Sequence, residues 1–215
     1  MKPSTVRRVF AAAVLAAGLS SPLPAAERAV LLRNGEIITV SSGTIHAGDI
    51  LVSGTKIAKI GKGIVAPPGA EVIDLGGRWV MPGIIDSHSH IALEGEVNES
   101  GELLTPEVDC RDVINPQDIN IFYALTGGVT SIHTMHGSAN PIGGRGIALK
   151  LRWGKSAAEL VFAGAPLTSK WALGENPKRS NSSGMGPARY PRTRMGVEQS
   201  IRSEFDKARD YLRTW

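Results

Sequence analysis

The chain has 215 residues, of which 42% are hydrophobic and 20% charged, an ordinary globular composition for one or two domains. Its formal net charge is +4, but Lys2, Arg7 and Arg8 lie in the first 26 residues, and without them the remainder carries about +1. So small a charge does not predict binding to nucleic acid or to an anionic membrane surface. Cys110 is the only cysteine, which excludes an internal disulfide and a cysteine metal cluster.

The first 26 residues have the features of an export signal. Three cations without an acidic residue precede the apolar run VFAAAVLAAGL, and the small-residue segment SSPLPAA follows it. The apolar run is shorter than the ~20 residues of a membrane-spanning helix, and no later stretch reaches that length. We therefore expect residues 1–26 to be a signal peptide and the mature protein to be soluble, without a membrane span, and periplasmic or secreted. The arginine pair in TVRRVF partly matches the twin-arginine pattern, so both the Sec and the twin-arginine routes stay open.

The next part of the chain predicts a small antiparallel β unit. Residues 27–79 contain AVLLRNGEIITV, GDILVSGTKIAKIG and EVIDLGG, which are β-rich and are separated by Gly, Ser or Pro. The continuous apolar run RWVMPGIID then indicates a strand buried on both faces, as parallel strands are.

A strand–helix–strand unit follows. NPQDINIFYALTGG predicts a helix with Asn115 as its N-cap and Gly127 or Gly128 as its C-terminal stop. GVTSIHTMHG predicts a strand directly after it, in the order of a βαβ unit.

The remaining segments are less regular. The glycine-rich GSANPIGGRGIALKL predicts an excursion before two further strands around AELVFAG and SKWALGE. GENPKRSNSSGMGPARYPRTR predicts a long functional loop, and residues 195–215 predict a helix whose apolar stripe packs on a sheet. GGRGIALK lacks the spacing of a phosphate-binding loop, so nucleotide binding is not expected.

The stretch VMPGIIDSHSH, residues 80–90, contains the strongest candidate site. Alternate side chains share one face of a strand, so Asp86, His88 and His90 are expected to point the same way. Two imidazoles whose roots are about 6–7 Å apart can converge on one metal ion. A histidine pair alone is equally compatible with surface or internally satisfied histidines, but its position at the end of a buried strand favours a metal site.

These residues closely resemble the first barrel strand of the metal-dependent amidohydrolase superfamily, where a Pro-Gly-apolar-apolar-Asp-x-His-x-His run opens a TIM-like barrel. VIDLGGRWVMPG resembles the end of that superfamily's N-terminal β-sandwich portion, and GGVTSIHTMHGSANPIGGRG and ALGENPKR resemble imidazolonepropionase-like members. The resemblance implies an α/β fold, with a small β-sandwich portion in residues 27–79 and the first part of a (β/α)8 barrel in residues 80–215.

The resemblance also implies a chemistry. His88 and His90 would bind one or two divalent ions, with zinc expected, and a metal-activated water would attack the C–N bond of a small amide, cyclic amide or dipeptide-like substrate. The family's full site adds a bridging Lys or Glu, two later histidines and a late aspartate that acts as general base.

Length limits how much of that site is expected. A complete barrel takes ~250 residues, so residues 80–215 accommodate about three or four of the eight strand–helix units. The later ligands are not expected here, and no catalytic base can be named. We expect the N-terminal part of an amidohydrolase; the alternative is a truncated, non-catalytic fragment that binds metal weakly and needs a complementary C-terminal half. The open strand edges of a partial barrel would favour pairing with that half or with another copy.

Three residues near the predicted strand ends are further candidates for orienting ligands or contacting substrate. Asp86 is expected to orient a histidine or to accept backbone hydrogen bonds. His133 and His136 are three residues apart and do not share one strand face, so packing in a loop or at the surface is the alternative.

Two charged residues after the last predicted strand are candidates of the same kind. Glu175 and Lys178 either orient substrate or form a surface ion pair. Lys170 is set aside as a bridging ligand, because the resembling family takes that ligand from a later strand.

Overall fold

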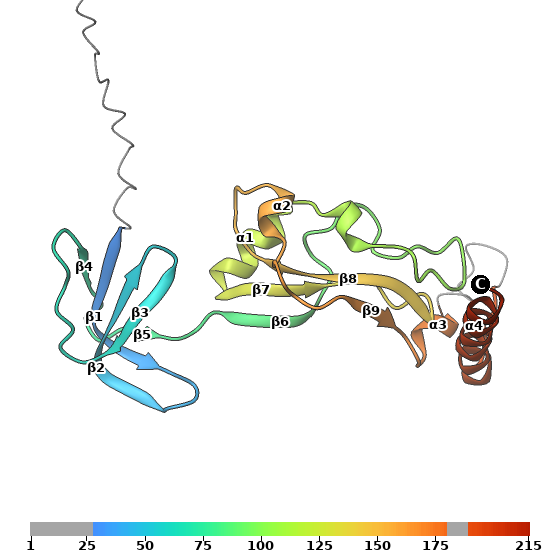
Figure 1. Cartoon of the computed structure of the whole chain (residues 1–215), viewed down its shortest axis with the longest axis horizontal. Helices are drawn as coiled ribbons and strands as arrows, with labels where there is room; N and C mark the ends of the chain where they lie inside the picture. Colours follow the sequence, from blue (N-terminus) through green and yellow to red (C-terminus); the bar gives the residue numbers. More distant parts are fainter. Residues whose placement is uncertain (1–27, 180–188) are drawn as a thin grey trace, which may run out of the picture. The chain divides into compact units, whose positions relative to one another are not determined.

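The computed structural model describes residues 28–179 and 189–215 (Figure 1). The predicted signal peptide, residues 1–26, lies outside the described residues, as do residues 180–188 of the predicted long loop. The chain divides into two compact units, Met1–Met81 and Pro82–Trp215, and each has its own β-sheet.

The first unit is a five-stranded sheet. Its strands are β1 (Ala29–Ile38), β2 (Thr44–Ser53), β3 (Lys56–Gly61), β4 (Glu71–Asp74) and β5 (Trp79–Val80). The order is β3-β2-β1-β4, and β5 also pairs with β1. The predicted antiparallel pairing holds for β1, β2 and β3 and is wrong for β4, which runs parallel to β1. β5, from the next predicted strand, also runs parallel to β1. Residues 62–70 carry the chain from β3 to the other side of β1, and such a crossover permits a parallel strand.

Asp49 connects separate segments of this first unit. Its side chain is buried, and it accepts hydrogen bonds from the backbone N–H of Asn34 at 3.2 Å and of Ile64 at 2.9 Å. These donors come from β1 and from the connection between β3 and β4, so one carboxylate on β2 ties three segments together. The Ile64 N–H, more than any other contact, holds the pKa of Asp49 below its ordinary value of 3.8.

Replacing Asp49 by Ala should lower the free energy of unfolding of this unit by about 2 kcal/mol, because two N–H groups lose a charged acceptor. The unfolded chain takes up the Asp49 proton first, so the contribution is complete above about pH 4 and is lost as the pH falls below that value. Hydrogen–deuterium exchange of residues 44–66 over a pH series measures both effects. Glu71→Gln, which changes an exposed carboxylate, is the control. Equal exchange in Asp49→Ala and the wild type would contradict this role.

The second unit is built on a four-stranded sheet with the order β6-β7-β8-β9. Its elements are β6 (Ile84–Ser89), η1 (Cys110–Val113), α1 (Ile119–Thr126), β7 (Val129–Thr134), β8 (Ile142–Lys150), α2 (Ala157–Leu160), β9 (Thr168–Trp171), α3 (Asn176–Arg179) and α4 (Arg194–Thr214). β6 and β7 pair parallel, and the other two pairings are antiparallel. This curled α/β sheet is a partial barrel, as predicted, although it is not all-parallel.

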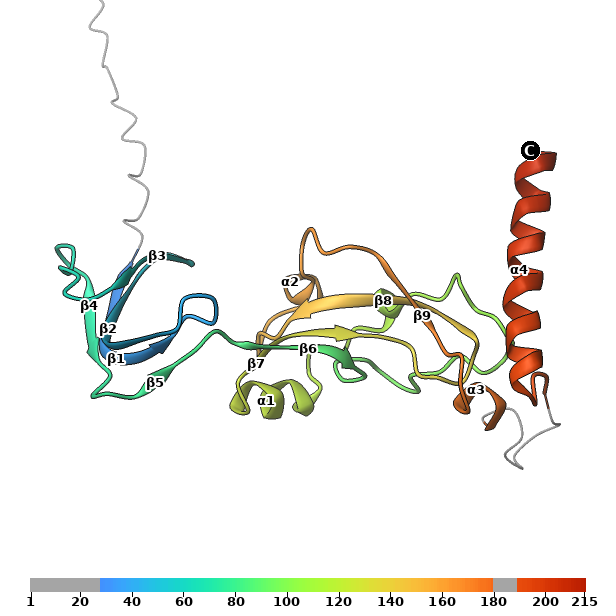
Figure 2. The same ribbon diagram turned by 90° about the horizontal axis from the view of Figure 1, so that it is seen from below.

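The connection from β6 to β7 contains α1 and completes the predicted strand–helix–strand unit (Figure 2). Asp118 is the N-cap, since its side chain accepts the Asn120 N–H at 3.0 Å. The prediction of Asn115 as the cap is wrong, because Asn115 closes the preceding turn by accepting the Gln117 N–H at 2.9 Å. Gly127 ends the helix, as predicted.

A cluster of buried apolar side chains forms the core of this unit. Its members are Ala92, Cys110, Ile121, Ile132, Ile147, Leu149, Leu151 and Leu160. Burial raises the pKa of the Cys110 thiol to about 11. Cys110 therefore stays protonated near neutral pH, where it packs as an apolar group and is not a nucleophile.

Two predictions between residues 137 and 164 are wrong. The glycine-rich segment contains β8, nine residues long, and the predicted strand around AELVFAG begins with α2. Glu159 accepts hydrogen bonds from the Ser156 N–H at 3.0 Å and hydroxyl at 2.8 Å, which fixes the start of α2. The glycines conceal β8 in the sequence, because glycine is depleted in strands and offers no side-chain pattern.

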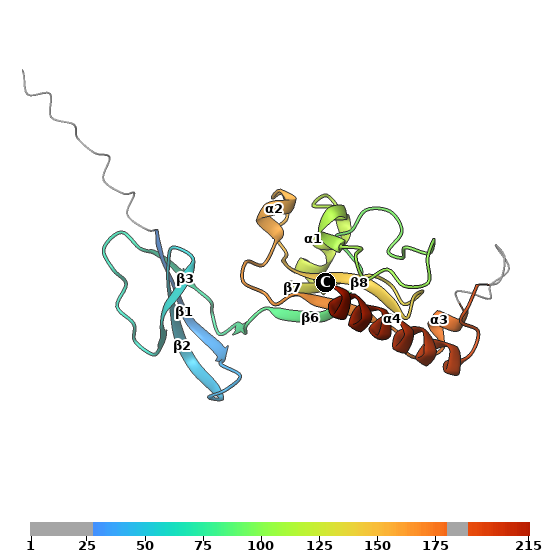
Figure 3. The same cartoon turned by 45° about the vertical axis from the view of Figure 1, so that its right-hand side comes forward.

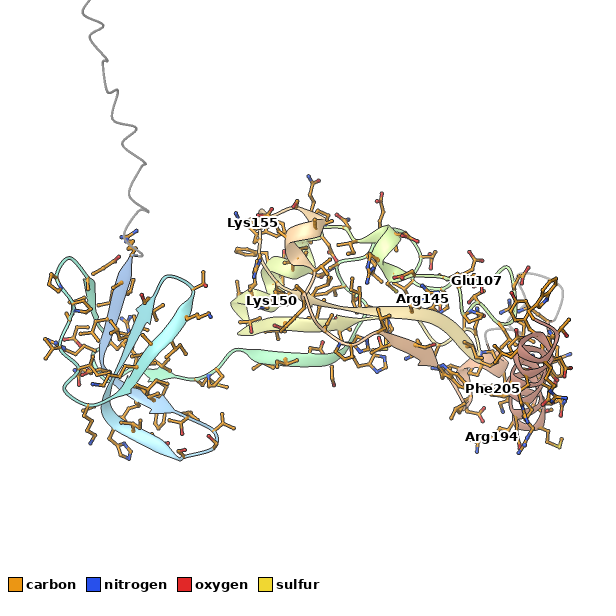
Figure 4. The ribbon with its side chains drawn as sticks, viewed as in Figure 1. Glu107, Arg145, Lys150, Lys155, Arg194 and Phe205 are labelled. Atoms are coloured by element: carbon orange, nitrogen blue, oxygen red, sulfur yellow. The ribbon has the colours of Figure 1, made fainter. Side chains whose placement is uncertain are left out.

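α4 begins at Arg194, one residue before the predicted start. The first part of its apolar stripe is covered, with Val197 2% exposed, whereas Leu212 is 77% exposed. Between them, Phe205 packs against Trp171 with ring centroids 5.7 Å apart (Figure 4). The start of α4 lies beside α3 (Figure 3). Within residues 28–179 and 189–215, no helix is both long and apolar enough to cross a membrane.

Candidate metal centre

The two histidines of the candidate motif lie at the end of β6. Ser89 is buried on one side of the strand, whereas His88 and His90 are exposed on the other. Their ring centroids are 5.1 Å apart, with the ring planes at 81°. The register between β6 and β7 shifts between Asp86 and Ser89, an irregularity of the kind that re-aims side chains at functional sites. The imidazoles therefore form a pair at the edge of the sheet.

His90 is held in one tautomer by its backbone contact. Its Nδ1 lies 2.8 Å from the Met135 carbonyl oxygen, which can only accept a hydrogen bond, so Nδ1 carries the proton. The Nε2 atom of the neutral ring then keeps its lone pair. Metal-binding histidines commonly donate their second ring N–H to a backbone carbonyl in this way. His90 thus has the orientation of a metal ligand.

The structure adds Lys170 to this pair. β6 and β9 are the two edges of the sheet, and the curl of the sheet brings them near each other (Figure 1). Lys170 Nζ lies 3.2 Å from His88 Nε2. Burial lowers the pKa of Lys170, and the charge of Lys170, followed by burial, lowers the pKa of His88. His88 therefore favours its neutral form, which is the form that binds a metal ion. From the sequence alone Lys170 is set aside, because the resembling family takes its bridging ligand from a later strand, and the position beside His88 follows only from the curl of the sheet.

The residues fit part of a metal site. In the part of the chain that the structure describes, no group of three or more His, Cys, Asp or Glu residues is placed to hold a metal ion. What converges is two imidazoles and one lysine amine. Imidazole nitrogens suit zinc and other first-row divalent metals, so the donor chemistry matches the predicted ion while the described donor set is small.

Asp86 stabilises the backbone next to the histidine pair. Its Oδ1 accepts the His88 N–H at 3.1 Å. Of the two roles considered from the sequence, the contact observed is the backbone hydrogen bond at the strand end. It constrains the position of His88 without touching the imidazole nitrogens.

The structure separates His133 from His136. His133, on β7, lies between β6 and β9, with Nδ1 3.3 Å from the Ser87 carbonyl oxygen and Nε2 2.7 Å from Thr168 Oγ1. His136 is only 3% exposed, and its Nε2 accepts the Glu99 N–H at 2.6 Å. His136 therefore anchors the segment after β6 rather than joining the histidine pair. The role of Thr168 is one that no sequence motif indicates.

Glu175 and Lys178 form an ion pair after β9. Lys178 Nζ lies 2.9 Å from Glu175 Oε1, and Arg194, at the start of α4, lies 3.2 Å from the same oxygen. Of the two roles considered from the sequence, the contact observed is the ion pair. It connects α3 with the start of α4.

These features define an α/β chain with a partial barrel and a histidine pair at the end of the first barrel strand. No protein-family model matches the chain. It is 31% identical over 186 residues to the amidohydrolase tasK of Hapsidospora irregularis, a match that covers 77% of this chain and 19% of that protein. It is also 31% identical over 148 residues to an adenine deaminase of Listeria innocua, covering 68% of this chain and 22% of that protein.

A solved structure shares the fold. An amidohydrolase from Thermotoga maritima matches with a TM-score of 0.76 and 38% identity, over 86% of this chain and 49% of that one. The chain therefore belongs to the amidohydrolase superfamily. It spans about a fifth of the length of the curated relatives and about half of the solved one. The closer likeness to imidazolonepropionase-like members stays a prediction.

Replacing His136 by Phe should release the segment after β6, because the Glu99 N–H loses its acceptor. Burial holds the pKa of His136 below 6.5, so the unfolded chain takes up this proton first. The wild-type segment should therefore also lose protection as the pH falls below 6.5. Hydrogen–deuterium exchange of residues 97–105, corrected for intrinsic rates, measures both effects, with the exposed His46→Phe as control. Unchanged protection in His136→Phe would show that the Glu99 contact does not hold the segment.

Proposed function

We propose that this chain carries the first ligands of a divalent-metal site in a hydrolase that cleaves C–N bonds of small amide, cyclic amide or dipeptide-like molecules. The observation that carries the proposal is the convergence of His88, His90 and Lys170 at one edge of the partial barrel. Relatives named amidohydrolase and adenine deaminase support the reaction class. Zinc is the proposed ion, because neutral imidazoles are its preferred nitrogen ligands.

The chain's own residues have distinct parts in this proposal. A bound zinc ion would lower the pKa of a water molecule to about 7 and polarise the carbonyl under attack. His90 presents Nε2, since Met135 fixes its other nitrogen as the donor. His88 presents a neutral ring, and Asp86 holds its backbone. Lys170 places its amine beside the His88 ring, and burial lowers the pKa of that amine.

A second candidate is a chain that binds metal weakly and is not catalytic by itself. The small donor set among the described residues favours it, because structural and catalytic zinc sites use at least three protein ligands. Further ligands would then come from a complementary half. In both cases we propose export to the periplasm or the medium, supported by the charged start and apolar run of residues 1–26.

Zinc titration against a chromophoric chelator tests the site. The wild type should bind about one ion per chain, and His88→Ala or His90→Ala should each weaken binding by at least about 100-fold, because each removes a direct ligand. His46→Ala, in the first unit, is the matched control and should bind as the wild type does. Equal affinity in all four proteins would contradict the ligand assignment. Zinc binding without hydrolysis of a panel of dipeptides and cyclic amides would favour the second candidate.

A further inference from the structure

We propose that His133 and Thr168 form a bridge across the second sheet that positions Lys170 against His88, and that Gly146 provides the space for it. The inference rests on the proposed function only in taking His88 and Lys170 as parts of a metal site. The bridge itself follows from hydrogen bonds, strand register and one missing side chain.

The hydrogen bonds assign a direction to the bridge. The Ser87 carbonyl oxygen, 3.3 Å from His133 Nδ1, can only accept, so Nδ1 carries a proton. In the neutral ring Nε2 is then an acceptor, and the Thr168 hydroxyl, 2.7 Å away, donates to it. Both ring nitrogens are used, so His133 has no lone pair left for a metal ion. Its position makes it a positioning residue rather than a ligand.

Strand alternation connects the two ends of the bridge to the site. Ser87 directly precedes His88 on β6. On β9, Thr168 and Lys170 are half-buried, whereas the residues that alternate with them are exposed, so the two side chains share a face. The imidazole therefore fixes the backbone beside His88 relative to the strand that carries Lys170.

Gly146 lies where the bridge passes β8. It pairs with Thr168 in the β8–β9 register. A Cβ at position 146 would lie 2.7 Å from His133 Nε2 and 3.0 Å from Thr168 Oγ1. The first distance is shorter than a real Cβ contact and the second is tight, so any residue larger than glycine would displace His133 and press against Thr168. Gly146 of GGRGIALK thus leaves the space in which His133 and Thr168 meet.

β9 needs such a support. It is an edge strand of four residues, and its pairing with β8 is interrupted by a register shift between Ile142 and Arg145. A strand so short has few ladder bonds, yet its lysine must stay within hydrogen-bond reach of an imidazole on the opposite edge of the sheet. Sites of this kind depend on neighbouring hydrogen bonds that fix side-chain positions.

The test uses Thr168→Val, which keeps the shape and removes the hydroxyl, and Thr168→Ser, which keeps the hydroxyl. Ser169→Ala, on the exposed side of the same strand, is the matched control. The first readout is metal-free: acetylation of Lys170 by a small amine reagent, followed by mass spectrometry. Thr168→Val should accelerate the labelling of Lys170, while Thr168→Ser and Ser169→Ala should label as the wild type does.

The second readout is zinc affinity. Thr168→Val should weaken it by about 10-fold, the usual effect of losing a hydrogen bond behind a metal ligand, and Thr168→Ser should restore it. If zinc binds normally and Thr168→Val changes neither readout, the bridge is refuted. It is also refuted if Thr168→Ser behaves like Thr168→Val. If the wild type binds no zinc but Thr168→Val alone exposes Lys170, the bridge stands and the proposed metal site fails.

Discussion

The packing of the second unit depends on the glycines of β8, because side chains from β7 and from the residues just after it lie against this strand. A Cβ at Gly143 would lie 2.5 Å from His136 Nδ1, and one at Gly146 would lie 2.7 Å from His133 Nε2. Gly144 has a φ of 98° and lies against the Val108 carbonyl oxygen. Three glycines in four positions thus let one strand accept two histidines and a loop at close range. Without this close packing, the segment after β6 and the strand β9 would lose their anchors.

The same packing decides the electrostatics at the end of β6. The curl of the sheet brings an amine from one edge next to an imidazole from the other. Since Lys170 lowers the pKa of His88, and burial lowers the pKa of Lys170 itself, both groups are pushed toward their neutral forms. Both shifts make loss of the proton easier than in the free side chains, and a nitrogen must lose its proton before it can bind a metal ion.

Local sequence patterns predict many of the elements, but they miss the contacts that depend on the curl of the second sheet. The helix ending at Gly127 and the strand–helix–strand order follow from periodicity and capping, which are local. The strand predicted over RWVMPGIID, buried on both faces, is wrong in extent and burial: it is divided into β5 and β6, and Ile84 and Ile85 are exposed. The sequence does not predict β8. Its glycines are required by the side chains that pack against them, and those contacts cannot be seen in a single sequence. Lys170 is missed for a related reason, since it is 82 residues from His88 and meets it only across the curled sheet.

X-ray absorption at the zinc K-edge of the zinc-loaded chain shows whether His88 and His90 bind the metal ion directly. If they do, the spectrum contains two imidazole nitrogens at about 2.0–2.1 Å, with the multiple-scattering pattern of histidine rings and no sulfur. An oxygen-only shell without imidazole scattering, or a sulfur at about 2.3 Å, would contradict direct binding by these histidines.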